Sequence, residues 1–304
     1  MMWLSGARPG FITCAWALLS LAGTLSATAA SPTKLKVFVS VDMEGIAGVV
    51  VERQTGPEGH DYALHREQMM AEANAAIAGA FDAGATEVVV LDSHGSGTNL
   101  RPDLLDPRAS LISGTPRPWG MVAGLDGSFD AMVFVGYHAS GSVPDGVLAH
   151  TFNLSPLSVR LNGQVVGEGG LSAAVGGHFN VPVVFGAGDR AFVRQFQGLR
   201  TGAELLATKD GLSSSSAALV HPYVVVEGIR KGVKAGLERR ATISPWQLGK
   251  PITLEVELGN TAEADRVMLI PAMARVDGRT VRYVAPDAPT MYRIFVLIDR
   301  LTGR

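Results

Sequence analysis

Two carboxylates stand at the end of an apolar run where the folded part of the sequence begins. Asp42 and Glu44 follow "LKVFVSV" and have a single residue between them. In an extended segment, side chains two positions apart lie on the same face. Two carboxylates on one face repel each other, and their pKa values rise on burial unless a cation compensates them. Helix capping by Asp42 beside an incidental Glu44 explains the pair equally well when it is taken alone.

Two histidines follow apolar runs of the same kind further along the chain. "EVVVLDSH" ends at His94, and "AMVFVGYH" ends at His138. Either histidine alone is more simply explained as a capped or solvated loop residue. Together with Asp42 and Glu44 they make a set of imidazoles and carboxylates. Such a set suits a first-row divalent metal, zinc best of all, with manganese or cobalt as alternatives.

The elements that carry these residues are predicted by the apolar runs themselves. Short runs rich in β-branched residues, without polar alternation, are typical of parallel strands buried on both faces. Residues 60–84, "HDYALHREQMMAEANAAIAGAFDAG", predict a helix that stops at Gly84. Strand, helix and strand then form a right-handed crossover. Ligands of open α/β sheets bind at the carboxyl ends of the strands, so we expect the polar residues to meet at that edge.

Two further polar residues stand near expected strands. "VPVVFGAG" leads into Asp189, for which a helix N-cap is favoured over a metal ligand. In "LSVRLNGQVVGEGG", Asn162 and Gly163 predict a hairpin, because both tolerate the positive φ of a tight turn. Glu168 follows the second arm of this hairpin and precedes a helix of small residues.

The last third of the chain has a different pattern. "ITLEVEL" alternates as a half-exposed strand does, a hairpin is predicted at Asp277 and Gly278, and "APTMYRIFVLIDRLT" predicts a closing helix. The serine-rich residues 211–218 are expected to form a loop or the start of a helix. The predicted fold class is α/β, a largely parallel sheet flanked by helices, with a smaller C-terminal α+β domain. We place the catalytic α/β domain at residues 31–210 and the C-terminal domain at 211–304.

The first thirty residues have the layout of a secretory signal peptide. An apolar stretch runs from Phe11 to Leu25 and is followed by the small residues "ATAA". The alternative is a single membrane anchor, but the stretch is short for a span of about 20 residues. Cys14, the one cysteine, lies in this segment, so the mature chain has neither a disulfide nor a thiol nucleophile. We expect an exported bacterial protein, periplasmic or extracellular, without a stable membrane span after cleavage.

The bulk composition adds little to this expectation. The formal net charge is −2, from 26 basic and 28 acidic residues. A nearly neutral chain offers no basic surface for nucleic acid, so we expect no nucleic-acid partner. The 47% of hydrophobic residues in 304 suits a soluble protein with a substantial core.

Six stretches resemble one known family and occur in the same order as in that family. They are "SVDMEGIAGV", "LDSHGSG", "LISGTPRPWGMVAGLD", "FVGYHAS", "AHTFN" and "NGQVVGEGGLSAAVGG". The chain resembles the D-aminopeptidases of the DppA type, a family of zinc metallopeptidases, over residues 35–300. The resemblance implies a catalytic role for His150 and a metal-binding role for five residues, which are Asp42, Glu44, His94, His138 and Glu168.

The resemblance also implies a reaction. Two zinc ions per subunit would bring four positive charges to three carboxylates and could activate a water molecule for attack on an amide bond. We therefore expect an aminopeptidase that releases N-terminal residues from short peptides. Another dimetal amidase, a phosphoesterase or a periplasmic metal- or peptide-binding protein without turnover are the alternatives. Family members form ring-like homo-oligomers, and a homo-oligomer is expected here.

Two features depart from the family pattern. Well-known members lack an export signal, whereas residues 1–30 predict one. Members often carry an Arg in the segment that reads Ser213–Ser216 in this chain. If that Arg contributes to substrate binding, the specificity differs, so the preference for D- over L-residues stays open.

Overall fold

The structure is a computed structural model that describes residues 6–7, 10 and 34–303 of the chain. The expected signal peptide over residues 1–30 lies outside the described residues apart from positions 6, 7 and 10. It therefore stays a prediction. Residues 34–304 form one compact unit. Among the described residues, no helix combines the length and the apolar character that crossing a bilayer requires.

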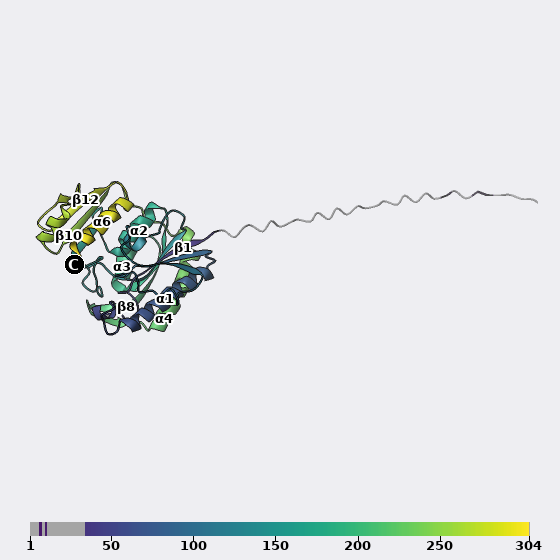
Figure 1. Cartoon of the computed structure of the whole chain (residues 1–304). Helices are drawn as coiled ribbons and strands as arrows, with labels where there is room; N and C mark the ends of the chain where they lie inside the picture. The colour runs from purple at the N-terminus through teal and green to yellow at the C-terminus, as the bar shows by residue number, and fades with distance from the viewer. Residues whose placement is uncertain (1–5, 8–9, 11–33, 304) are drawn as a thin grey trace, which may run out of the picture. The chain divides into compact units, whose positions relative to one another are not determined.

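A seven-stranded sheet forms the larger part of this unit (Figure 1). Its strands follow the order β3-β2-β1-β4-β7-β8-β9, and every neighbouring pair is parallel except the last. The central position of β1 explains its apolar sequence, because β1 pairs with β2 on one side and with β4 on the other. The strands are β1 Lys36–Val41, β2 Glu87–Asp92, β3 Ala109–Ile112, β4 Ala131–Tyr137, β7 Val183–Asp189, β8 Glu204–Ser213 and β9 Ser216–Leu219.

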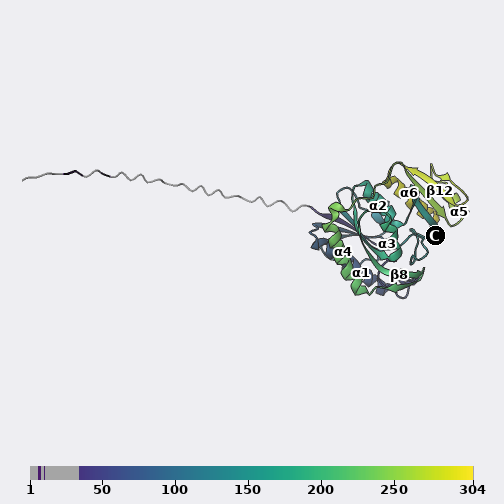
Figure 2. The ribbon, with the colours of Figure 1, turned by 180° about the vertical axis from the view of Figure 1, so that it is seen from behind.

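Helices cover both faces of this sheet (Figures 1 and 2). Alternate residues of β1 point to opposite faces, so Val37 and Val39 join one buried cluster and Phe38 joins the other. Helices α1 (Tyr62–Asp82) and α4 (Pro222–Glu238) pack on the first face, and α2 (Glu168–His178) and α3 (Arg190–Gln197) pack on the second. The predicted helix after the first strand and its parallel crossover are confirmed by α1 and by the pairing of β1 with β2.

A second sheet has five antiparallel strands in the order β11-β12-β10-β5-β6. The alternating sequence of β10 leaves one face buried against helices, as the pattern predicts. Figure 1 shows β10, β12 and α6 together in the yellow-green part of the chain. The elements of this layer are β5 Pro156–Leu161, β6 Gln164–Val166, β10 Ile252–Leu258, α5 Thr261–Val267, β11 Ala274–Arg275, β12 Thr280–Ala285 and α6 Ala288–Thr302. Elsewhere in the described residues, three short 3-10 helices span Glu52–Gln54, Gly120–Val122 and Arg240–Thr242.

The predicted division between residues 210 and 211 needs correction. It falls inside β8, which continues to Ser213 and pairs with β9 to extend the large sheet. The serine-rich residues 211–218, expected as a loop or helix start, form this hairpin instead. Conversely, β5 and β6 belong to the second sheet although they precede residue 210 in the chain. The hydrogen-bond ladders, which sequence patterns do not specify, decide which layer each segment joins.

Candidate metal centre and catalytic site

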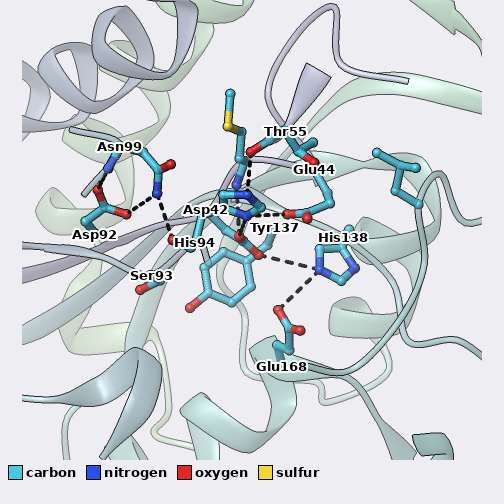
Figure 3. A network of polar contacts seen from close by, with 12 residues as sticks. Asp42, Glu44, Thr55, Asp92, Ser93, His94, Asn99, Tyr137, His138 and Glu168 are labelled. Atoms are coloured by element: carbon cyan, nitrogen blue, oxygen red, sulfur yellow. Dashed lines mark hydrogen bonds and ion pairs between the residues drawn. The ribbon is translucent and has the colours of Figure 1, made fainter. Parts of the chain in front are cut away.

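Six side chains expected to carry the chemistry converge at the carboxyl edge of the large sheet. Figure 3 labels all of them except His150. They line a cleft of about 680 Å³ or lie directly beneath it. Four come from strand ends, one opens helix α2 and one belongs to the loop between β4 and β5. In chain order they are Asp42 and Glu44 after β1, His94 after β2, His138 after β4, His150 in the loop, and Glu168 at the start of α2.

The turn after β1 is held tightly against β4. The backbone N–H of Asp42 donates to Val135 O at 2.8 Å, and the N–H of Gly45 donates to Gly136 O at 2.7 Å. A Cβ atom at Gly45 would lie 1.9 Å from Tyr137 O, so only glycine permits this approach. The strand therefore ends in a fixed turn that directs both carboxylates to the sheet edge.

His94 faces the two carboxylates of this turn with one ring nitrogen. Its Nδ1 lies 3.3 Å from Asp42 Oδ1 and 3.1 Å from Glu44 Oε2 (Figure 3). Its Nε2 lies 2.8 Å from Thr55 O, a carbonyl that can only accept. The ring therefore carries a proton on Nε2, which leaves Nδ1 as the atom available for a metal. A ligating histidine whose other nitrogen donates to a backbone carbonyl is the usual arrangement at metal sites.

His138 repeats this arrangement with the opposite nitrogen. Its Nδ1 donates to Ala139 O at 2.9 Å, so Nε2 is the free ring atom. That Nε2 lies 3.5 Å from Asp42 Oδ2 and 3.2 Å from Glu168 Oε2. His138 Nε2 and Asp42 Oδ2 are buried and have no hydrogen-bond partner within the described residues. Buried polar atoms without partners are costly, and a cation between them would satisfy both.

His150 stacks on His138 and completes the group. The ring centroids are 4.3 Å apart with an interplanar angle of 22°. The Nδ1 of His150 donates to Leu148 O at 2.7 Å, and its Nε2 lies 3.9 Å from Glu168 Oε1. That oxygen also accepts the backbone N–H of Phe152 at 2.6 Å. His150 therefore presents Nε2 to the cleft with its tautomer fixed from behind.

The buried carboxylates of this site need positive charge nearby to remain ionised. Burial raises the pKa of Asp42 well above its usual range, and the neighbouring Glu44 raises it further. Burial would also raise the pKa of Glu44, but His94 beside it holds that pKa well below its usual range. Burial disfavours a charged His138, yet Glu168 raises the pKa of this imidazole well above its usual value. Protons on the imidazoles balance the carboxylates, and divalent cations would take the place of those protons.

The donor atoms fit more than one cation. Ligand atoms of Asp42, Glu44 and His138 lie within 4.8 Å of one another, and so do those of His138, His150 and Glu168. Asp42 has one oxygen toward His94 and the other toward His138. Carboxylate and imidazole are suitable zinc ligands. Geometry alone thus includes His150 in a ligand set, although the family resemblance implies a catalytic role for it.

Comparison with known proteins identifies the family of this chain. The family model for M55 peptidases, described as D-aminopeptidase, matches residues 35–297. The chain belongs to this family. It is 33% identical over 271 residues to a D-aminopeptidase of Bacillus subtilis (strain 168), a match that covers 89% of this chain and 98% of that protein. The solved structure of the Zn-dependent D-aminopeptidase DppA from Bacillus subtilis, a self-compartmentalizing protease, has a TM-score of 0.86 at 33% identity, with 89% and 98% of the two chains covered.

In this M55 peptidase, two acidic residues near the centre have structural roles. Asp189 caps α3 by accepting from Phe192 N at 2.7 Å, which confirms the predicted N-cap. Its second oxygen accepts from Val147 N at 2.8 Å and so fixes the loop that carries His150. Asp92 accepts from the backbone of Asn99 at 2.5 Å and closes the loop after His94 (Figure 3).

The structure of this M55 peptidase also reveals polar residues that the sequence patterns missed. Lys209 and Glu72 are buried beneath the turn after β1. Their hydrogen bonds reach backbone atoms of that turn. The sequence signal is a lysine inside "ELLATKDGLS", the segment that forms β8, because a buried charge in a strand needs partners.

Proposed function

We propose that this protein is a zinc-dependent aminopeptidase that releases N-terminal residues, D-amino acids among them, from short peptides. The observation that carries the proposal is the convergence of Asp42, Glu44, His94, His138 and Glu168, each histidine with its second nitrogen on a backbone carbonyl. These five residues would hold the zinc ions. When bound, the ions supply Lewis-acid activation of the scissile carbonyl and of the attacking water.

His150 has the geometry of a proton carrier for this reaction. Its Nδ1–H donates a hydrogen bond to Leu148 O, so the neutral ring presents a basic Nε2 to the cleft. Glu168 lies 3.9 Å from that nitrogen and would stabilise the protonated ring. In this proposal, Nε2 accepts a proton from the attacking water and delivers it to the leaving amine.

The outer cleft suits a substrate with a free amino group. Glu52, Glu263 and Asp299 line it and add carboxylates to those of the proposed metal ligands. Asp299 is held in place by the side-chain amide of Asn153, which donates to it at 2.7 Å. Carboxylates in a partly enclosed cleft attract the ammonium group of a peptide N-terminus. Arg117 and Arg300 line the same cleft, so the distinction between a peptide and a phosphate ester rests on the substrate test below and not on the charge of the cleft.

Chelation and paired substrates test the proposed reaction. Purified protein with zinc is expected to release alanine from D-Ala and L-Ala dipeptides at different rates. Removal of zinc by a chelator should abolish the release, and added zinc should restore it, because the ions supply the activation of the carbonyl and of the attacking water. Liberated amino acid and protein-bound metal would be measured on the same samples.

Other outcomes of this experiment point to the alternatives. Release of phosphate from an aryl phosphate, without release of alanine, would indicate a phosphoesterase at the same site. Bound zinc without turnover of any of these substrates would indicate a binding protein. A chain that retains no metal, or that keeps full activity after chelation, would contradict the zinc proposal itself.

We further propose that the protein forms a homo-oligomer. The similar Bacillus subtilis structure is described as a self-compartmentalizing protease. Large apolar side chains are exposed here on the β8–β9 hairpin and on α4, among them Leu212, Leu219 and Tyr223. Burial between subunits would remove this apolar surface from water. Light scattering at micromolar concentration would give the molar mass, and a value at or below 31.9 kDa, the mass of the whole chain, would contradict the proposal.

Export remains a proposal that rests on residues 1–30 alone. The apolar stretch followed by "ATAA" predicts cleavage shortly before the folded sequence. We propose a periplasmic or extracellular bacterial enzyme on this basis. N-terminal sequencing of the protein recovered from a fractionated bacterial host would test it. An intact N-terminus in the cytoplasmic fraction would contradict export.

A further inference from the structure

A lysine without any exposed surface lies directly beneath the turn that carries two of the proposed zinc ligands. Lys209, on β8, has an exposed fraction of 0%. Its Nζ donates to Glu44 O and to Val49 O, both at 2.5 Å. These two carbonyls lie at opposite ends of the Glu44–Val49 segment and take part in neither strand nor helix. One ammonium group therefore ties the two ends of this segment together.

The same segment is held from two further directions. Thr208, the neighbour of Lys209 on β8, donates its hydroxyl to Gly45 O at 2.6 Å. Glu72, on α1, accepts from Ala47 N at 2.9 Å and is also fully buried. The middle of the segment is thus bonded to a helix and to a strand that lie far apart in the sequence. None of these three side chains belongs to the proposed ligand set.

Hydrogen bonding alone does not explain why the residue is a lysine. A buried ammonium costs several kcal/mol of desolvation, and a neutral amide could donate to the same carbonyls without that cost. The compensation comes from Asp189, Glu72 and Glu44, whose negative charges favour the ammonium form. A cation at this position therefore offsets part of the negative charge that the ligand turn concentrates.

We propose that Lys209 is a positioning residue that sets the placement of Glu44 and thereby the affinity of the site for its metal. The inference rests on the proposed function, because it assumes that this carboxylate binds zinc. Lys209 touches the backbone of the turn and not the reacting atoms. Its effect on catalysis is accordingly indirect and passes through the ligands.

Replacement of Lys209 by methionine tests the proposal. Lys209→Met keeps a long unbranched side chain and removes both the charge and the donors. We expect the zinc dissociation constant to rise between about 10- and 100-fold, the range typical for partners of metal ligands. The zinc dissociation constant would be measured by competition with a chromogenic chelator, on the protein without the proposed signal peptide. The visible absorption of the cobalt(II)-loaded variant should also change, because this spectrum reports ligand geometry.

The matched control removes a lysine from the other end of the same sheet. Lys36, at the amino end of β1, contacts Ser128 and Glu87 and lies outside the cleft. Lys36→Met is expected to leave zinc affinity and the cobalt spectrum unchanged. Circular dichroism and the thermal midpoint of each variant would establish that the comparison is made between folded proteins.

The outcomes separate this inference from the function on which it rests. Wild-type protein that binds no zinc would overturn the proposed function first. Wild-type protein that binds zinc, together with a folded Lys209→Met variant of equal affinity and equal cobalt spectrum, would overturn the inference alone. If Lys209→Met does not fold, Lys209→Gln is measured in the same way and judged by the same criterion. Failure of both variants to fold would show that Lys209 serves the stability of the whole chain, and this too would overturn the proposal.

Discussion

Replacing His150 by alanine is expected to reduce peptide hydrolysis by about 100- to 10,000-fold, the usual contribution of a general acid–base group. The ring is fixed by its bond to Leu148 O, so its Nε2 is held at the cleft without a structural partner beyond Glu168. Removal of the ring takes away the proton carrier and leaves the carboxylates in place. Zinc content should therefore stay unchanged while kcat falls.

Metal content is the decisive measurement in this prediction. Ligand atoms of His150, His138 and Glu168 lie within 4.8 Å of one another, so a ligand role for His150 is geometrically open. If His150→Ala lost zinc in proportion to activity, His150 would be a ligand and not a proton carrier. His60, whose side chain is 94% exposed, provides the control, because His60→Ala should change neither quantity.

The sequence patterns predicted the convergence of the proposed ligands at one sheet edge, but not which layer each segment joins. Each proposed ligand except Glu168 lies within three positions of the end of a strand, and parallel strands bring their carboxyl ends to one edge. The meeting of Asp42, His94 and His138 thus depends on topology that the runs already indicate. Glu168 was harder to place from the residues alone, since a hairpin separates it from the parallel strands, and the family resemblance supplied its role.

Other features of the site depend on contacts that no local pattern contains. The tautomer of His94 is set by Thr55 O, a loop carbonyl 39 positions earlier in the chain. Lys209 reaches the Glu44 carbonyl across 165 positions. A serine-rich segment can form a loop or an edge hairpin, and only the ladder between β8 and β9 decides between them. These contacts are long-range, so they follow from the assembled sheet and not from the sequence near each residue.

The largest effect on metal binding is expected from Asp42→Asn. Asp42 lies between the two halves of the site, with Oδ1 at 3.3 Å from His94 Nδ1 and Oδ2 at 3.5 Å from His138 Nε2. Asparagine has the same shape and can keep the bond that Met43 N donates to Oδ1 at 2.9 Å. It removes the negative charge and replaces one oxygen with a donor. Both halves of the site should therefore lose affinity at once.

Substitutions of Glu44 and Glu168 provide the comparison for Asp42→Asn. Glu44 contacts His94 alone among the histidines, and Glu168 contacts His138 and His150. Glu44→Gln and Glu168→Gln should each weaken mainly one zinc ion, whereas Asp42→Asn should weaken both. Hydrolysis should fall by at least about 1,000-fold in Asp42→Asn, because metal activation contributes several kcal/mol and each 1.4 kcal/mol is tenfold in rate. Zinc titrations of the three variants give the stoichiometries.

The thermal stability of the metal-free protein is a second, independent test of Asp42→Asn. Burial and Glu44 hold the pKa of Asp42 above its usual range, so at neutral pH its charge costs stability in the folded state relative to the unfolded one. Asp42→Asn should therefore raise the thermal midpoint of the metal-free protein. Zinc, which stabilises the wild type by binding the folded state, should no longer raise the midpoint of the variant. A variant that keeps two zinc ions with wild-type affinity would show that Asp42 does not bridge the site, and the charge argument would then apply to Glu44 and Glu168 alone.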